Sequence, residues 1–182
     1  ELINTLNLFI DSNKSEIEAA SNLIVDTFQS KGKLLIFGNG GSAADAQHFA
    51  AEFVNYMTPR IKRSGLPAIS LSADTSVITS IANDTDYTEI FARQIDALAT
   101  DVDVAIAFST SGKSQNCVKA LELAKLKGLK SISFTKKNSN MAELTDICLA
   151  VPSDNTQHIQ ECHIFAYHVI VEMVELSMIK ED

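Results

Sequence analysis

Apolar side chains recur every three or four positions over the first 29 residues, which is the spacing of one face of an amphipathic helix. The residues that carry this spacing are Leu2, Leu6, Phe9, Ile10, Ile17, Ile24 and Phe28. A second stretch, 157–178, has the same periodicity and a broader apolar face. Its apolar residues are Ile159, Ile164, Phe165, Val169, Ile170, Met173, Val174 and Leu176. Because one sheet face would need less apolar surface than this, we expect both terminal helices, 1–30 and 157–178, to pack against other copies of the chain.

Short continuous apolar runs, the pattern of strands buried on both faces, lie between these helices. They cover residues 34–37, 67–71, 102–108, 131–134 and 147–151. Helical patterns separate them at 42–56, 88–98 and 114–127. Alternating strands and helices predict βαβ units, and therefore an α/β fold with a doubly wound parallel sheet of about five strands. No repeat, low-complexity tract or Pro/Gly-rich linker divides the chain, so we expect one domain over residues 1–182.

The composition narrows the class of protein. The chain has 182 residues, 46% hydrophobic and 21% charged, as in a folded globular domain. No segment reaches the roughly 18–20 consecutive apolar residues of a membrane span, and nothing at the start resembles a secretion signal, so we expect a cytoplasmic protein without a membrane partner. The net charge of −8, without a Lys/Arg cluster, argues against nucleic acid as a partner. The isolated cysteines fit a reducing compartment and argue against a cysteine zinc site; they are Cys117, Cys148 and Cys162.

A glycine-rich turn, 38–45, follows the first predicted strand and opens the next helix with the sequence Gly-Asn-Gly-Gly-Ser-Ala-Ala-Asp. Glycines let backbone N–H groups approach an anion, and the helix N-terminus adds a favourable dipole. The turn also satisfies the G-x-G-x-x-A pattern of dinucleotide-binding folds. That alternative requires an acidic residue about 20 positions further on. There is none between Glu52 and Asp74, so we favour a smaller anion.

A hydroxyl-rich loop, 109–114, follows the predicted strand 102–108 and opens another helix. Its residues, Ser-Thr-Ser-Gly-Lys-Ser, include four hydroxyl side chains where helix N–H groups lack partners. One Ser or Thr would suffice for simple N-capping. Four exceed that need and favour a site for a phosphate monoester, held by hydrogen bonds instead of lysine charges. We interpret Lys113 as a solvated side chain.

Two helices carry candidate metal-binding or substrate-binding groups. His48 and Glu52 are four residues apart, so their side chains share one helix face. A surface hydrogen bond between them is the simpler alternative, but the nearby glycine turn favours a functional pair. Gln160 and His168, eight residues apart on the last helix, can also face one side, whereas Cys162 points roughly opposite. Spacing alone favours neither of the two further candidates, His158 and His163.

Several stretches together resemble the phosphoheptose isomerase family. The longest runs from Gly38 to Glu52, and Asn83-Asp84, residues 109–114 and residues 151–168 follow it in the family's order. The resemblance implies the sugar-isomerase (SIS) fold, a flavodoxin-like three-layer sandwich, in a homotetramer with active sites between subunits. It also implies conversion of sedoheptulose 7-phosphate to D-glycero-D-manno-heptose 7-phosphate through an enediol, for the heptose of lipopolysaccharide or capsule.

The resemblance assigns roles to individual residues by their position in the motifs. It makes His48, Glu52, Gln160 and His168 the ligands of one Zn²⁺ per subunit. For proton transfer through the enediol we expect Glu52 and His168 to act as base and acid, in an order that the sequence leaves open. The residues that the resemblance places against the sugar phosphate are Asn39, Gly40, Gly41, Ser42, Glu52, Asn83, Asp84, Ser109, Thr110, Ser111, Ser114 and Gln160.

The chain departs from the family pattern after Glu52. Asn55-Tyr56 stands where the family usually has Gly-Arg, so a substrate-facing arginine is absent or is replaced by Arg60, Lys62 or Arg63. This departure leaves open an isomerase of a related sugar phosphate. A second alternative is a non-catalytic SIS-fold regulator that binds a replication-initiation protein. Such relatives lack the Glu and the final His of the motif, and both residues are present here.

Overall fold

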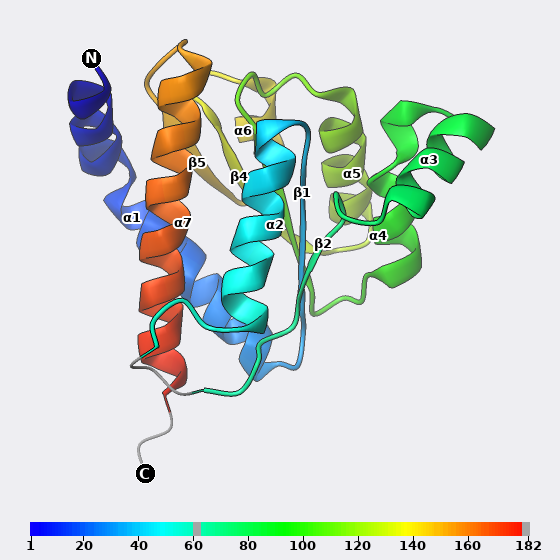
Figure 1. The fold of residues 1–182 in the computed structure, drawn as a ribbon, viewed down its shortest axis with the longest axis horizontal. Coiled ribbons are helices and arrows are strands. Elements are labelled where there is room, and N and C mark those ends of the chain that lie inside the picture. The colour runs from blue at the N-terminus through cyan, green and yellow to red at the C-terminus, as the bar shows by residue number, and fades with distance from the viewer. Residues whose placement is uncertain (60–62, 180–182) are drawn as a thin grey trace.

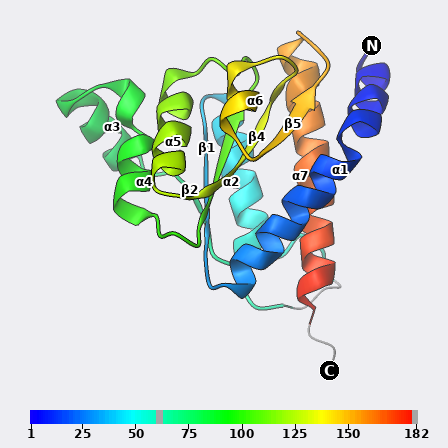
Figure 2. The same ribbon diagram turned by 180° about the vertical axis from the view of Figure 1, so that it is seen from behind.

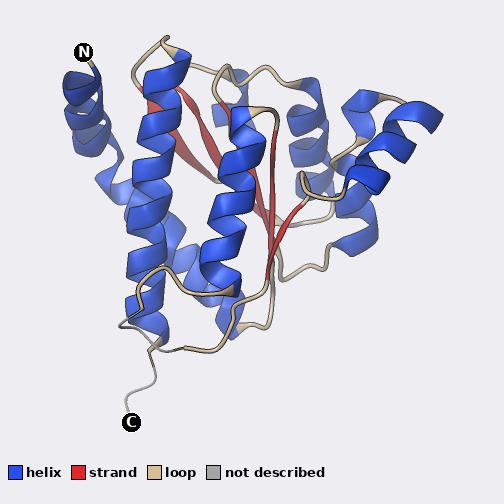
Figure 3. Cartoon of the chain, viewed as in Figure 1, coloured by secondary structure: helices blue, strands red, loops and turns tan. Residues whose placement is uncertain are grey.

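Five parallel strands form one sheet in the order β2-β1-β3-β4-β5 (Figure 1, Figure 3). The computed structural model of the chain describes residues 1–59 and 63–179. The strands are β1 (Leu34–Gly38), β2 (Ala68–Ser70), β3 (Val104–Ser109), β4 (Lys130–Lys136) and β5 (Ile147–Val151). The chain builds outward from β1 on both sides, so the strand order reverses between β1 and β3. In doubly wound folds, ligands bind outside the carboxyl ends of the strands at this reversal.

Three long helices cover one face of the sheet, namely α1 (Leu2–Gln29), α2 (Gly41–Val54) and α7 (Thr156–Met178) (Figure 1). Because α2 and α7 each follow a parallel strand, they run side by side in the same direction. Phe49 of α2 stacks on Tyr167 of α7 with ring centroids 5.2 Å apart. Beneath them Phe108 and Phe134 stack at 4.3 Å. This aromatic core fixes the spacing between the two helices that carry the candidate metal ligands.

The helices of the opposite face are shorter (Figure 2). They are α3 (Thr75–Asp84), the 3₁₀ turn η1 (Tyr87–Glu89), α4 (Ala92–Leu98), α5 (Gln115–Leu126) and α6 (Asn140–Leu144). On this face β3 presents Ala105 and Ala107, which are both completely buried. These small side chains let α5 lie close to the sheet, because dense packing leaves room only for the volume that is present.

The α/β fold predicted from the sequence is confirmed, with the five-stranded parallel sheet and the long terminal helices. The helix expected at 88–98 is divided, because η1 and α4 are separate elements. The analysis of the sequence pattern did not identify α3, a short helix without a fully buried residue, although Ile78, Ile81 and Ala82 pack against the core at helical spacing. Its start is nevertheless marked by Asp74, whose carboxylate accepts from the Val77 N–H at 3.0 Å. Among the described helices, none has an apolar stretch long enough to cross a bilayer.

The long first helix is tied to the edge of the sheet at a bend. Asn13 leaves helical geometry, with φ −127° and ψ 16°. Its side-chain amide donates to the Ala150 carbonyl at 3.2 Å and accepts from the Ala150 N–H at 2.9 Å. Ala150 belongs to the edge strand β5, whose outer backbone groups would otherwise lack partners. The bend therefore joins α1 to the sheet by a pair of hydrogen bonds.

Candidate active site

The turn after β1 and the loop after β3 are neighbours at the reversal of the sheet, since Gly38 is paired with Phe108 there. A Cβ at position 38 would lie 2.7 Å from the Ser42 carbonyl oxygen and 2.9 Å from that of Phe108, so only glycine fits. Gly40 has a φ of +58°, a conformation that glycine adopts without steric cost. These glycines bring the start of α2 directly against the end of β3.

Helices α2 and α5 both begin at this edge of the sheet, and neither has a side-chain cap at its N-cap position. Gly40 occupies the capping position of α2 and Ser114 that of α5, and neither helix receives a side-chain hydrogen bond there. Ser114 Oγ lies instead 3.1 Å from Ser109 Oγ, which accepts from the Gly112 N–H at 3.1 Å. Capping therefore does not explain Ser114. In α2 the Ser42 and Ala43 N–H groups donate to the Asn39 and Gly40 carbonyls, and in α5 the Cys117 N–H donates to Asn116 Oδ1. The N–H groups of Gly41, Gln115 and Asn116 have no partner among the described residues and are left to attract an anion.

Loop 109–114 packs against the end of β4. Gly112 has a φ of +64°, and a Cβ there would collide with the Ser139 side chain and lie 2.8 Å from Thr135 Oγ1. Thr135 donates its hydroxyl hydrogen to Ser139 Oγ at 3.1 Å. From the inside outward, the hydroxyl residues of the loop are buried Ser109, half-buried Thr110 and Ser114, and exposed Ser111.

Asn39 is fixed by a reciprocal pair of amide hydrogen bonds. Its Nδ2 donates to Asn116 Oδ1 and its Oδ1 accepts from Asn116 Nδ2, both at 2.9 Å. The Tyr87 hydroxyl donates to the same Asn39 Oδ1 at 3.0 Å. The turn after β1 is thereby joined to α5 and to η1. Sequence analysis identified neither Asn116 nor Tyr87, and their spacing carries no signal that would have done so.

His48, Glu52 and His168 form a cluster on the exposed side of the contact between α2 and α7. Each offers one ligand atom, and these three atoms lie within 4.8 Å of one another. His48 Nε2 is 2.8 Å from Glu52 Oε1, and the rings of His48 and His168 are 5.1 Å apart between centroids. The side chain of His48 is 46% exposed and that of Glu52 is 18% exposed, so a ligand can reach the cluster from solvent.

The donor set of this cluster fits zinc. Two imidazole nitrogens and one carboxylate leave a further position for substrate or water, as in catalytic zinc sites. Zinc bonds of about 2.0–2.1 Å place tetrahedral ligands roughly 3.3 Å apart, so small side-chain rotations would close the observed separation of up to 4.8 Å. Burial lowers the pKa of His168, and the charge of His48 acts in the same direction. The lowered pKa favours the neutral imidazole that binds a metal.

Gln160 of α7 packs against Gly41, the first residue of α2. A Cβ at position 41 would collide with the Gln160 amide, so glycine makes room for it. His168 follows Gln160 by about 12 Å along the helix axis, at a rise of 1.5 Å per residue. The amide therefore lies beside the carboxyl ends of β1 and β3, at the edge formed by the turn 38–42 and loop 109–114, which we call the crevice. His168 lies beside His48 instead, so the single chain does not bring Gln160 to the cluster.

Comparison with known proteins bears directly on this arrangement. A family model described as SIS domain matches residues 1–136. The chain is 49% identical to the phosphoheptose isomerase of Thermodesulfovibrio yellowstonii over 176 residues, which cover 96% of this chain and 87% of the relative. The chain belongs to the phosphoheptose isomerase family.

Solved structures agree with this family membership. A phosphoheptose isomerase from Neisseria gonorrhoeae matches with a TM-score of 0.90 at 33% identity, over 97% of this chain and 94% of that one. A phosphoheptose isomerase from Francisella tularensis matches with a TM-score of 0.91 at 32% identity, over 96% and 92% of the two chains. The likeness therefore extends over almost the whole length of all three chains.

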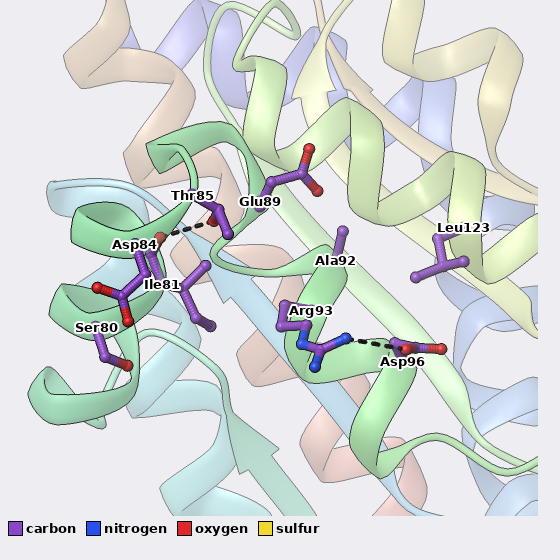
Figure 4. A pocket seen from close by; sticks show the side chains of 9 residues that line it. All are labelled: Ser80, Ile81, Asp84, Thr85, Glu89, Ala92, Arg93, Asp96 and Leu123. Atoms are coloured by element: carbon purple, nitrogen blue, oxygen red, sulfur yellow. Dashed lines mark hydrogen bonds and ion pairs between the residues drawn. The ribbon is translucent and has the colours of Figure 1, made fainter.

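Two residues of the phosphoheptose isomerase motifs lie on α3, which extends away from α2 and α7 (Figure 1, Figure 2). Asn83 Nδ2 donates to Asp84 Oδ1 at 2.8 Å. Asp84 lines a groove of about 600 Å³ between α3, α4 and α5, together with Glu89 and Arg93 (Figure 4). Within one chain, the motif residues therefore lie in two separate places: Asn83 and Asp84 on α3, and the others at the ends of β1 and β3 and along α2 and α7.

Arg63 does not replace the arginine that phosphoheptose isomerases usually carry after the motif glutamate. Its side chain is 3% exposed and pairs with the fully buried Glu175 of α7 at 2.9 Å. It also donates to the carbonyl oxygens of Phe53 at 2.8 Å and Glu52 at 2.7 Å. The hypothesis that Arg63 faces the substrate is therefore wrong. The other two candidates, Arg60 and Lys62, lie outside the described residues.

The remaining candidates on α7 are not part of the cluster. His163 is completely buried, with its ring 5.8 Å from those of Phe108 and Phe134, and burial lowers its pKa to about 3. Cys162 is completely buried in the core, which confirms its interpretation as a packing residue. His158 is half-buried in the first turn of the helix and is not among the clustered ligands.

Two residues that sequence analysis overlooked contact or face the cluster. The Tyr167 hydroxyl lies 2.8 Å from His48 Nδ1. Asp45 is 6% exposed, and its Oδ2 has no partner in the described part of the chain. Burial raises the pKa of Asp45 to about 6, while the charge of His48 lowers it. Asp45 precedes His48 by three residues on one helix face, and this spacing could have identified it. Tyr167 has the spacing of an ordinary core aromatic.

Proposed function

We propose that this chain is a cytoplasmic, zinc-dependent isomerase that converts sedoheptulose 7-phosphate to D-glycero-D-manno-heptose 7-phosphate, for the heptose of lipopolysaccharide or capsule. The main support is the cluster of His48, Glu52 and His168 on the same two helices that border a crevice with uncapped helix N-termini. An isomerase of this kind needs both the cluster and the anion site, because the reaction occurs at C1 and C2 while the phosphate is at the far end of the sugar. All three cysteines are free thiols, as in a reducing compartment.

The crevice is the proposed site of the phosphate and of the neighbouring sugar hydroxyls. Hydroxyl groups of loop 109–114 would donate to phosphate oxygens, and the two helix N-termini add partial positive charge. From Ser42 to His48 the helix α2 rises by about 9 Å, a span that a seven-carbon sugar phosphate can bridge. The crevice residues in this proposal are Asn39, Gly40, Gly41, Ser42, Ser109, Thr110, Ser111 and Ser114.

His48, Glu52 and His168 would hold one zinc ion per subunit. Gln160, the further ligand that the family implies, packs against Gly41 in the single chain, so it would reach the ion only across a contact between subunits. When bound, the ion would polarise the C2 carbonyl and stabilise negative charge on the enediol oxygens. The crevice at the other end of α2 would fix the distance between the phosphate and the carbonyl. Such positioning supplies a large part of the rate enhancement in reactions of this type.

Glu52 and His168 are the proposed proton-transfer groups. The ketose loses a proton from C1 and the aldose gains one at C2, while a proton also moves between the two oxygens. Of the two carboxylate oxygens of Glu52, Oε1 bonds His48, and Oε2 has no hydrogen bond within the described part of the chain. The other oxygen is therefore available, which supports Glu52 as the base at carbon. The lowered pKa of His168 keeps its ring neutral at pH 7, so it can relay a proton between the oxygens.

A homotetramer of single-domain chains (residues 1–182) is the proposed assembly, with each active site between subunits. Apolar side chains on the terminal helices are exposed in the single chain, including Ile3 at 77%, Leu8 at 51% and Leu176 at 59%. Their burial between copies would contribute favourable free energy. Contacts between copies would also allow Asn83 and Asp84 of one subunit to approach the cluster of another.

Incubation of the zinc-loaded protein with ketose phosphates of five to seven carbons, followed by NMR, tests this function. We expect sedoheptulose 7-phosphate to be converted fastest, to an aldose product. Faster conversion of a pentulose or hexulose phosphate would show that the enzyme prefers a shorter sugar. This alternative matters because Arg63 is buried and cannot replace the substrate-facing arginine of the family. If no sugar changed and no stoichiometric zinc were held, the chain would be a non-catalytic SIS-fold regulator instead.

A further inference from the structure

The hydroxyl of Tyr167 is the partner of the second ring nitrogen of His48. Its oxygen lies 2.8 Å from His48 Nδ1, while Nε2 of the same ring lies 2.8 Å from Glu52 Oε1. Tyr167 is completely buried, whereas the His48 side chain is 46% exposed. The imidazole is therefore held between a buried group on one side and the open metal cluster on the other.

The Tyr167 ring has little freedom to move. It stacks on Phe49 with centroids 5.2 Å apart and meets the Phe108 ring edge-on at 6.1 Å. The His48 ring packs edge-on against it at 5.3 Å. Because aromatic packing fixes the phenol, the hydroxyl oxygen has a defined position, and this position selects one orientation of the His48 ring.

A hydroxyl differs from most partners of a ligating histidine because it can both donate and accept a hydrogen bond. Because a carboxylate only accepts, the neutral metal-free ring of His48 fits with its proton on Nε2, which donates to Glu52, while Nδ1 accepts from the Tyr167 hydroxyl. With a metal on Nε2, the ring proton must be on Nδ1, which then donates to the Tyr167 oxygen. A carboxylate or a carbonyl oxygen in place of the hydroxyl could serve only the second arrangement.

We propose that Tyr167 is a positioning residue of the metal site, which keeps the His48 ring in one orientation in both tautomers. Nε2 can then exchange its hydrogen bond to Glu52 for a bond to the ion without rotation of the ring. The inference rests on the proposed zinc site, and it adds to that site a residue outside the ligand set. Partners of this kind typically change metal affinity by about 10–100-fold.

Tyr167→Phe is the direct test, because it removes the oxygen and retains the ring that packs in the core. Metal-free wild type and variant are titrated with Zn²⁺ against a chromophoric chelator, and with Co²⁺ to record the ligand-field bands. We expect the variant to bind Zn²⁺ about 10–100-fold more weakly and to show altered Co²⁺ bands. Tyr87→Phe is the matched control, since it removes the same atom from a phenol that bonds Asn39, and its Zn²⁺ affinity should equal that of wild type.

The outcomes separate this inference from the proposed function. Equal Zn²⁺ affinity and Co²⁺ bands in wild type and Tyr167→Phe would overturn the role of Tyr167 and leave the zinc site standing. Absence of stoichiometric binding by wild type would overturn both. Thermal melts of the metal-free proteins verify folding, and a merely structural role of Tyr167 would lower the melting temperature without changing the Co²⁺ bands.

A measurement on wild type keeps the inference testable even if the variant folds poorly. In ¹⁵N NMR spectra of the imidazole groups, zinc addition should move the His48 proton from Nε2 to Nδ1. Coordination through Nδ1, with the Tyr167 hydrogen bond lost, would contradict the proposal.

Discussion

Two polar clusters join α2 to α7, and they differ in their access to solvent. Near the end of α2, the side chains of Arg63 and Glu175 are almost completely buried, and the five guanidinium N–H groups all have an acceptor. Nearer the crevice, the side chains of His48 and Glu52 are 46% and 18% exposed. Each cluster has one buried carboxylate oxygen without a partner among the described residues, on Glu175 and on Asp45. The buried ion pair stabilises the contact between the helices, whereas the groups that solvent reaches can bind a ligand.

Glu52 belongs to both clusters through different atoms. Its carbonyl oxygen accepts from Arg63 at 2.7 Å, while its carboxylate bonds His48 at 2.8 Å. The Arg63 cluster therefore holds the backbone of a proposed catalytic residue and leaves its side chain available. The comparison predicts that loss of the ion pair in the first cluster lowers stability, and that substitution of His48, Glu52 or His168 changes catalysis and metal binding.

The largest effect is expected from Glu52→Gln and from His168→Gln. Each should lower turnover of sedoheptulose 7-phosphate by about 10³-fold, because each removes a proposed proton-transfer group and a metal ligand. The free energy of unfolding of the metal-free proteins should change by less than about 1 kcal/mol, since neither side chain is part of the core. Steady-state assays and urea unfolding measure the two quantities. Near wild-type turnover by either variant would contradict the catalytic assignment.

Arg63→Met should have the opposite profile. It leaves the buried Glu175 carboxylate without its partner, and the free energy of unfolding should fall by about 3–5 kcal/mol in urea titrations. The double variant Arg63→Met/Glu175→Leu removes both charges and should recover most of this loss. If the double variant were as unstable as the single one, packing would account for the effect and the ion pair would not.

Asp45→Asn probes the second cluster through pH. Asp45 titrates at about 6 in the folded chain against an ordinary value of 3.8, so its ionised form opposes folding above pH 6. This opposition fades as the pH falls through 6 and the folded carboxyl becomes protonated. The substitution should therefore raise the free energy of unfolding of the metal-free protein by about 2 kcal/mol at pH 8 and by less than about 1 kcal/mol at pH 4.5. An equal effect at both values in urea titrations would contradict the raised pKa.

Tyr87→Phe should have the smallest effect of the series. It removes one hydrogen bond to Asn39, which is worth about 1 kcal/mol. KM for the sugar phosphate should rise about fivefold with little change in kcat, because the Asn39 amide pair with Asn116 remains. Steady-state kinetics measures both constants. A fall in kcat without a change in KM would contradict the view that Tyr87 acts on substrate binding through Asn39.

The sheet could be predicted from the sequence because its strands are buried on both faces and are continuously apolar. All five residues of β1 are buried, and so are all six of β3. In contrast, α3 has no buried residue, and its apolar side chains at helical spacing, Ile78, Ile81 and Ala82, are only partly buried. The fully buried strands are therefore plain in the sequence, whereas this ten-residue helix at the margin of the core is marked only by a few apolar positions and its N-cap Asp74.

The site could be predicted only in part. The i, i+4 spacing of His48 and Glu52 indicated a pair on one face, and the structure confirms it. That His168 of α7 reaches them depends on the aromatic packing between the helices, which a single sequence does not display. Arg63 was misinterpreted because an arginine near a proposed phosphate site suggests substrate binding, while its buried partner Glu175 is 112 positions away.

Turnover of sedoheptulose 7-phosphate by metal-free protein, before and after addition of one equivalent of Zn²⁺ per chain, tests the central claim most directly. The account predicts turnover at least about 100-fold lower without the ion, since the enediol charge then lacks a stabilising cation, and full recovery at one equivalent. Turnover at the full rate by the metal-free protein would contradict it.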